Sequence, residues 1–122
     1  MAKKILLIED DIETAEIVVE ALGSKGYEVK AVGSGDEGLR LADSFRPDLV
    51  ITDIMMEGTH GYQVIEELRR ERDSKTLPIM VVSAKAFPPD VQVASELGAD
   101  AFLAKPFELR KLMEKVAELL GD

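Results

Sequence analysis

The sequence contains no cysteine and no tryptophan, and aromatic residues make up only 5% of its 122 residues. The absence of cysteine excludes disulfide bonds, thiol nucleophiles and thiolate metal sites, and it is typical of a reducing compartment. Basic residues are also scarce: 15 Lys and Arg against 24 Asp and Glu leave a formal net charge of −9, which argues against direct binding to nucleic acid. No apolar run approaches the ~18 residues that span a bilayer, and the five residues between Lys4 and Asp10 are too few for a secretory segment. We therefore expect a cytoplasmic protein that does not bind a membrane.

Short apolar runs alternate with stretches of helical periodicity along the whole chain. The runs are nearly continuous and rich in Val, Ile and Leu, which is typical of strands covered on both faces. They predict strands at residues 4–8, 27–32, 49–52, 79–82 and 101–103. Between the runs, apolar residues recur three and four positions apart, which is typical of amphipathic helices. This spacing predicts helices at residues 15–22, 34–45, 61–72, 88–97 and 109–120.

The five strand–helix repeats are expected to form a single domain over residues 1–122, because no linker, low-complexity segment or charged tail interrupts them. Strands that alternate with helices of this length favour a parallel sheet with right-handed crossovers. Two layouts fit, half of a Rossmann fold and the five-stranded flavodoxin-like order 2-1-3-4-5. The first connection has no glycine to let its backbone approach a pyrophosphate, and its acidic residues would repel a flavin phosphate. We therefore predict an α/β three-layer sandwich with strand order 2-1-3-4-5.

Acidic residues and one lysine follow three of the predicted strands. Asp10 and Asp11 come after the first strand, Asp53 after the third, and Lys105 after the fifth. The carboxyl ends of parallel strands meet at one edge of the sheet, where open α/β sheets bind their ligands. Two carboxylates ~4 Å apart repel each other by about 4 kcal/mol at an effective dielectric of ~20. Either proton uptake or a divalent cation relieves this repulsion, and an all-oxygen site with open positions suits magnesium.

The same edge contains groups suited to phosphoryl transfer. A carboxylate such as Asp53 can form an aspartyl phosphate in covalent catalysis. Lys105 would place a positive charge beside a phosphate oxygen, and Ser83, after the fourth strand, would donate a hydroxyl hydrogen bond to another. A simpler interpretation also applies to the first acidic pair, because Asp10 and Asp11 could cap the following helix at the positive end of its dipole.

Five short motifs occur in order along the chain and resemble those of a known family. They are Glu9-Asp10-Asp11, Asp53-Ile54-Met55-Met56 with Gly61, Ser83-Ala84-Lys85, Gly98-Ala99-Asp100 and Lys105-Pro106-Phe107. Each motif alone has little specificity, but five in this order, with the expected element between each pair, are specific. Over essentially its whole length the chain resembles the receiver domain of two-component response regulators.

The resemblance implies a phosphoacceptor and a magnesium site. Asp53 would accept the phosphoryl group. Asp11, Asp53 and the Met55 backbone carbonyl would bind the magnesium ion, and Asp10 would act on it mainly through water. These roles follow from matching motif positions rather than from spacing alone.

The resemblance also implies a switch. Ser83 and Lys105 would contact the phosphoryl group, and the peptide bond between Lys105 and Pro106 would be cis. Phe102 would be the aromatic switch residue, although it lacks the hydroxyl of the tyrosine usual in the family, so it would act by ring packing alone. Glu57 stands where the family often has proline, and it would add negative charge beside the site.

The expected function is a phosphoacceptor switch in a two-component system or phosphorelay. A sensor histidine kinase or histidine phosphotransfer protein would donate to Asp53, and the face formed by the fourth helix, fifth strand and fifth helix would then change its binding to a protein target. The chain would catalyse only its own phosphorylation and dephosphorylation, as a monomer or a weak phosphorylation-dependent dimer. One alternative is an interaction module that works without phosphorylation. Another is a small aspartyl-phosphate hydrolase, which is disfavoured because such enzymes have an Asp-x-Asp arrangement after the first strand, whereas Asp10 and Asp11 are adjacent, and because 122 residues leave little room for a cap domain that would select a substrate.

Overall fold

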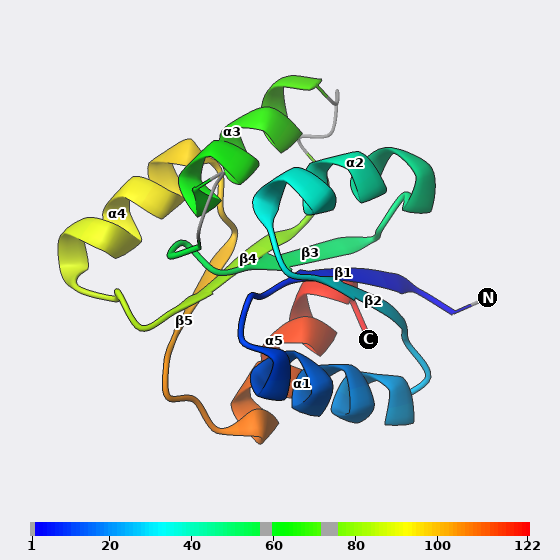
Figure 1. Ribbon diagram of the computed structural model, residues 1–122. Helices are drawn as coiled ribbons and strands as arrows, with labels where there is room; N and C mark the ends of the chain where they lie inside the picture. The colour runs from blue at the N-terminus through cyan, green and yellow to red at the C-terminus, as the bar shows by residue number, and fades with distance from the viewer. Residues whose placement is uncertain (1, 57–59, 72–75) are drawn as a thin grey trace.

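The computed structural model describes residues 2–56, 60–71 and 76–122, in which five strands alternate with five helices (Figure 1). The strands are β1 (Lys4–Ile8), β2 (Glu28–Val32), β3 (Leu49–Thr52), β4 (Ile79–Ser83) and β5 (Ala101–Ala104). The helices are α1 (Ile12–Ser24), α2 (Gly35–Phe45), α3 (Gly61–Glu71), α4 (Pro88–Leu97) and α5 (Leu109–Leu120). Each predicted strand and helix is present, with small differences at the ends.

The five strands form one parallel sheet in the order β2-β1-β3-β4-β5, which confirms the predicted topology. At the end of β1, Ile8 pairs with Val32 of β2 on one side and with Thr52 of β3 on the other. The strands β1 and β3 therefore end at the same level. As a result, the residues that follow them lie together at the carboxyl edge of the sheet, on the left of Figure 1.

Helices cover both faces of the sheet and complete the three layers (Figure 1). On one face, α1 and α5 contribute Leu22 and Leu112 to a buried core. On the other face, α2 and α3 contribute Phe45 and Ile65 to a second core, which α4 also helps to cover. Because successive strand residues point to opposite faces, a continuous apolar run such as residues 5–8 supplies both cores.

Local signals determine where individual helices begin and end. At the start of α2, the Ser34 hydroxyl oxygen accepts a hydrogen bond from the backbone N–H of Glu37 at 3.2 Å and so caps the helix. At the end of α4, Gly98 adopts φ +117°, a conformation that glycine tolerates without steric cost. These contacts fix the helix ends in addition to the packing of the apolar faces.

The strand β2 differs from the expectation that all five strands are covered on both faces. Glu28, Lys30 and Ala31 of this strand are exposed, whereas β3 and β4 are buried throughout. The reason is its position at the edge of the sheet, where it pairs with β1 alone. The short run of β-branched residues predicts the strand correctly but not its place in the sheet.

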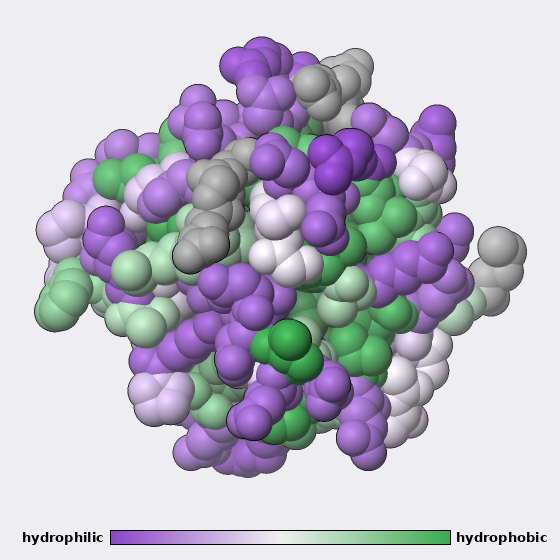
Figure 2. Space-filling model, in the orientation of Figure 1, coloured by the Kyte–Doolittle hydropathy of each residue, from purple (hydrophilic) through white to green (hydrophobic). Residues whose placement is uncertain are grey.

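The surface is largely polar, in keeping with the net charge of −9. Figure 2 shows that hydrophilic side chains predominate on the face viewed, with scattered apolar areas between them. Across residues 2–56, 60–71 and 76–122, no helix has both the length and the apolar character needed to cross a membrane. Glu57, for which the sequence predicts a charge effect on the site, lies outside the described residues.

Candidate functional site

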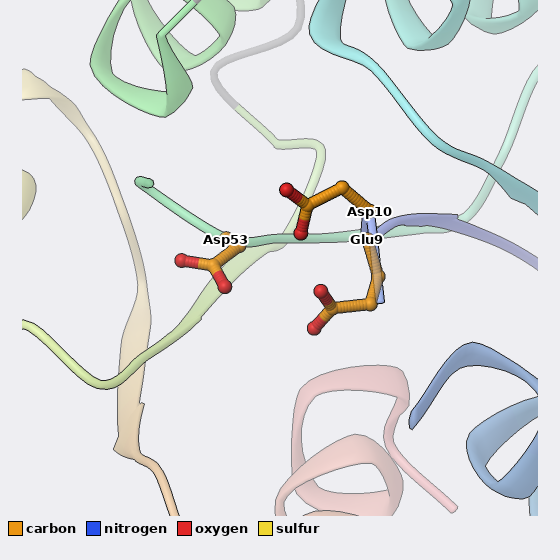
Figure 3. A group of neighbouring side chains, drawn as sticks. All are labelled: Glu9, Asp10 and Asp53. Carbon is orange, nitrogen blue, oxygen red and sulfur yellow. The ribbon is translucent and has the colours of Figure 1, made fainter. Parts of the chain in front are cut away.

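Three carboxylates come together at the carboxyl edge of the sheet, directly after β1 and β3. Glu9 and Asp10 follow β1, and Asp53 follows β3 (Figure 3). The ladder continues one step past the strands, since the backbone N–H of Asp53 donates to the Ile8 carbonyl at 3.2 Å. This extension holds Asp53 directly beside the end of β1.

One carboxylate oxygen from each of Glu9, Asp10 and Asp53 lies within 4.8 Å of the other two. Figure 3 shows that Glu9 and Asp10 leave the chain on different sides and that both carboxylates turn towards Asp53. Glu9 and Asp53 are buried, with 5% and 6% of their surface exposed, while Asp10 is exposed. Three carboxylate oxygens that lie close together, one of them exposed to solvent, are the kind of ligand that magnesium prefers.

The Lys105 ammonium bridges the two buried carboxylates. Its Nζ lies 2.5 Å from Glu9 Oε1 and 2.7 Å from Asp53 Oδ2. Burial by itself would lower the pKa of Lys105, but the hydrogen bonds to Asp53 and Glu9 outweigh it and raise the pKa above its ordinary value. Burial also raises the pKa of Glu9, and the hydrogen bond from Lys105 offsets this only in part. Lys105 is therefore cationic at neutral pH, and the site contains more negative charge than one ammonium balances.

The Asp53 carboxylate is held in place from two sides. Its Oδ1 accepts a hydrogen bond from the Met55 backbone N–H at 3.0 Å, and its Oδ2 contacts Lys105. Gly61, the first residue of α3, packs against the backbone here, because a Cβ at this position would lie 2.2 Å from the Asp53 carbonyl oxygen. The close approach of α3 thus holds the backbone of Asp53 in place.

Ser83 and Lys105 lie at the ends of the neighbouring strands β4 and β5. The Lys105 backbone N–H donates to the Ser83 carbonyl at 2.9 Å, and the Ser83 hydroxyl oxygen accepts from the Lys85 N–H at 3.0 Å. Ser83 is fully buried, whereas Ala84 next to it is exposed. The peptide bond between Lys105 and Pro106 is cis.

Phe102 lies in the middle of β5 and is half-buried. Its ring packs against the core that α2, α3 and α4 cover, and in the sheet Phe102 is the ladder partner of Val81 on β4. The structure therefore places Phe102 in the core on the α4 side of the sheet, two residues before the strand end that leads to Lys105.

Asp11 has a different position from the one that the sequence analysis predicts. It is the N-cap residue of α1: its Oδ2 accepts hydrogen bonds from both the backbone N–H and the hydroxyl of Thr14. These two hydrogen bonds lower the pKa of Asp11, whose side chain is exposed to solvent. The carboxylate that joins Asp10 and Asp53 in the described cluster is that of Glu9.

Glu9 belongs to the carboxylate cluster although the sequence analysis names only Asp10, Asp11 and Asp53 as acidic ligands, and two features of the sequence indicate its placement. It is the first acidic residue after a run of buried apolar residues, so it stands closest to the strand end. Asp11, in turn, precedes a helical stretch with Thr14 three positions on, which is the spacing of a helix cap. Assigning the cap first would have left Glu9 and Asp10 as the acidic pair of the site.

Comparison with known proteins gives matches along nearly the whole chain. A family model described as the response regulator receiver domain matches residues 5–117. The DNA-binding response regulator MtrA of Mycolicibacterium paratuberculosis is 34% identical over 116 residues, which cover 95% of this chain and 50% of MtrA. The chain spans about half the length of the curated relatives it matches.

Solved structures match the fold over the same extent. The Vibrio cholerae chemotaxis protein CheY4 has a TM-score of 0.93 at 28% identity, covering 98% of this chain and 100% of that protein. The receiver domain of a sensor histidine kinase from Pseudomonas aeruginosa PAO1 has a TM-score of 0.89 at 28% identity, and the match covers 100% of both chains. That receiver domain was solved with a magnesium ion coordinated in its active site cleft.

Proposed function

Because this chain belongs to the response regulator receiver domain family, we propose that it is a phosphorylation-controlled switch whose phosphoacceptor is Asp53. Receiver domains are phosphoacceptor switches of two-component signal transduction rather than classical enzymes. The observation that supports the assignment is the Asp53 carboxylate, which is buried and lies between the Lys105 ammonium and the Met55 backbone N–H. Such a carboxylate is both oriented for attack and next to a fixed positive charge.

We assign the magnesium site to Glu9, Asp10 and Asp53, together with the Met55 backbone carbonyl. The donor set fits this ion, since all the side-chain ligands are carboxylate oxygens within 4.8 Å of one another and one of them is open to solvent. Glu9 replaces Asp11 in this assignment because the Asp11 carboxylate caps α1. When bound, a divalent ion would neutralise the negative charge that builds up between the carboxylates and an incoming phosphoryl group.

The phosphoryl group would come from a phosphohistidine of a sensor histidine kinase or a histidine phosphotransfer protein. A carboxylate oxygen of Asp53 attacks phosphorus, the P–N bond to the donor imidazole breaks as a P–O bond to Asp53 forms, and the released imidazole takes up a proton. The Lys105 ammonium, already 2.7 Å from Asp53 Oδ2, then pairs with a phosphoryl oxygen. The chain catalyses its own modification in this way, and hydrolysis of the acyl phosphate returns it to the resting state.

The switch would begin at Ser83, whose hydroxyl oxygen accepts from the Lys85 N–H in the resting state. A phosphoryl group adds about −1.5 to −2 charge and strong acceptor oxygens. Ser83 then donates its hydroxyl hydrogen to one of these oxygens, the loop after β4 follows, and Phe102 repacks into the space that the loop leaves. The face formed by α4, β5 and α5 changes its binding to a downstream protein as a result.

We infer that residues 1–122 act as one receiver unit in the cytoplasm, as a monomer or a weak phosphorylation-dependent dimer. The prediction that nucleic acid is not bound directly applies to this unit, because its net charge is −9. MtrA, whose name includes DNA binding, is about twice as long as the matched region. The output of the whole protein is therefore assigned to a protein or domain that this unit controls.

The experiment that tests the function is phosphorylation by a small-molecule phosphodonor such as acetyl phosphate in the presence of Mg²⁺. The unaltered chain should gain the mass of one phosphoryl group, and Asp53→Asn should not, because an amide oxygen is a far weaker nucleophile than a carboxylate. Asp11→Asn is the matched control, since it makes the same change at the helix cap and should still be phosphorylated. Uptake by Asp53→Asn at the same stoichiometry would refute the assignment. A chain that neither takes up the group nor binds Mg²⁺ would point instead to an interaction module that works without phosphorylation.

A further inference from the structure

We propose that Tyr62 is a positioning residue whose hydroxyl restrains the loop between β4 and α4 in its resting placement, an inference that rests on the proposed switch function. Tyr62 belongs to the first turn of α3 and Asp90 to the first turn of α4. The Tyr62 hydroxyl donates to the Asp90 backbone carbonyl at 3.3 Å and so joins the two helices at the ends nearest the site.

The Tyr62 side chain is placed to make this contact. Its ring is half-buried and packs against the core that α2, α3 and α4 cover. Burial, together with the charge of Asp90, raises the pKa of Tyr62 above its ordinary value. The hydroxyl therefore keeps its proton at neutral pH and can act only as a donor towards the carbonyl oxygen.

From Asp90 the contacts continue through Phe87 and Lys85 of the loop to Ser83. The Asp90 carboxylate accepts a hydrogen bond from the Phe87 N–H at 3.1 Å and lies 3.5 Å from the Lys85 ammonium. The Lys85 N–H in turn donates to the Ser83 hydroxyl oxygen at 3.0 Å. Asp90, whose backbone carbonyl accepts from Tyr62, is thus linked directly to Phe87 and Lys85 and, through Lys85, to Ser83.

On its other side Tyr62 is joined to the segment that follows Asp53. The Tyr62 backbone N–H donates to His60 Nδ1 at 3.2 Å, and the two rings are 5.0 Å apart. Gly61, between them, packs against the Asp53 backbone. Tyr62 therefore connects the end of the loop after Asp53 to the start of α4, and these two segments border the proposed phosphoryl site.

Two features of this chain give the contact a function. Phe102 has no hydroxyl, so it cannot hydrogen-bond to the loop after β4 in either state of the switch. In addition, α4 begins with Pro88 and Pro89, which have no N–H group to donate.

At 3.3 Å the Tyr62 contact is long for an O–H···O hydrogen bond. A weak contact of this kind can break when the loop moves, as a reversible restraint must.

Removing the hydroxyl should therefore shift the switch towards its active placement. A contact made only in the resting state raises the free energy needed to leave that state, and its loss favours any ligand that binds the other state. Beryllofluoride with Mg²⁺, an analogue of the phosphoryl group, should bind Tyr62→Phe about two- to tenfold more tightly than the unaltered chain, the range that corresponds to one net hydrogen bond.

The chain offers a matched control, because it contains two tyrosines. The Tyr27 hydroxyl donates to the Asp122 carboxylate at 2.7 Å, in contacts that do not include the loop after β4. Tyr27→Phe removes the same atom and should leave the affinity for beryllofluoride unchanged. Equal or weaker binding by Tyr62→Phe, or an equal gain in both variants, would overturn the proposal.

A second measurement on the unmodified protein separates this inference from the proposed function. The Val91 N–H donates to the Phe87 carbonyl at 3.2 Å in the first turn of α4. Its hydrogen exchange should be about two- to tenfold faster in Tyr62→Phe than in Tyr27→Phe or the unaltered chain. If the unaltered chain did not bind beryllofluoride, the proposed function would fail, while exchange would still decide whether Tyr62 restrains α4. Unchanged exchange at Val91 would overturn the restraint itself.

Discussion

At the scale of single residues, the site depends on the direction in which consecutive acidic side chains point. Glu9 and Asp10 turn towards Asp53 (Figure 3), whereas Asp11 is the N-cap of α1 and its carboxylate accepts hydrogen bonds from Thr14. The chain leaves the extended geometry of β1 and enters a helix within these three residues. Three carboxylates that look equivalent in the sequence therefore have two different placements, two of them beside Asp53 and one at the start of α1.

The two adjacent aspartates provide the first test of this assignment. Asp10→Ala should weaken Mg²⁺ binding by roughly 10- to 100-fold or more, since removing even a group that only supports a metal ligand costs this much. Asp11→Ala should leave Mg²⁺ binding largely unchanged and lower the urea midpoint of unfolding, because it removes the N-cap of α1. Titration with Mg²⁺ by calorimetry and urea unfolding of both variants measure these effects. The reverse pattern would return the metal ligand to Asp11.

At the scale of elements, the junction between β3 and α3 organises the site. Gly61 is buried at the start of α3, and its N–H donates to the Ile54 carbonyl at 3.1 Å. Near the other end of the helix, the Arg69 guanidinium donates to the carbonyls of Leu77 and Gly98. The helix is thus fixed at both ends, and its first turn lies against the backbone that supports Asp53.

A side chain at Gly61 should therefore disturb the acceptor. Its Cβ would lie 2.2 Å from the Asp53 carbonyl oxygen and 2.5 Å from Ile54 Cα, both of which are backbone atoms that cannot rotate away. Gly61→Ala should lower the free energy of unfolding by about 1–3 kcal/mol, as overpacking does, and should slow phosphorylation by acetyl phosphate.

Gly23→Ala is the control for this prediction. Gly23 lies within α1 and has no atom within 4 Å of an added Cβ, so alanine should stabilise the chain by up to ~1 kcal/mol through helix propensity. Chemical unfolding measures both variants. A Gly61→Ala variant as stable and as readily phosphorylated as the unaltered chain would show that the close approach of α3 is unimportant.

At the scale of the whole molecule, the buried charge of Glu9 opposes folding at neutral pH. Burial raises the pKa of Glu9 above 4.5, so folding disfavours its charged form. A carboxyl whose pKa is raised in the folded state contributes stability below pH 4.5 and loses that contribution as pH rises through the folded-state pKa. Lys105, whose pKa is raised above 10.5, keeps its own contribution throughout the neutral range.

The pH dependence of Glu9→Gln tests this account. Without Mg²⁺, the variant should be more stable than the unaltered chain at pH 7, because the amide keeps an acceptor for Lys105 and removes the buried charge. The difference should disappear below pH 4.5, where Glu9 itself is protonated. Urea unfolding between pH 4 and pH 8 measures it. Glu20→Gln, which removes a charge from an exposed position on α1, should show no such gain, and a Glu9→Gln variant less stable than the unaltered chain at pH 7 would contradict the prediction.

The amino-acid sequence alone determined the elements, their order and the residues at the ends of the strands. Buried parallel strands appear as continuous apolar runs and amphipathic helices as a period of 3.6, so β1 to β5 and α1 to α5 could be predicted. Asp53, Ser83 and Lys105 could be named because each comes directly after a strand or ends it.

The tertiary structure decided what depends on side-chain direction and on contacts between distant segments. It placed Glu9 rather than Asp11 in the carboxylate cluster with Asp10 and Asp53, and it exposed β2 because that strand lies at the sheet edge. The contact of Tyr62 with Asp90 joins residues 28 positions apart, and no local pattern indicates it. Periodicity reports which face of an element is buried, but the neighbour that each side chain meets is set by how the elements pack.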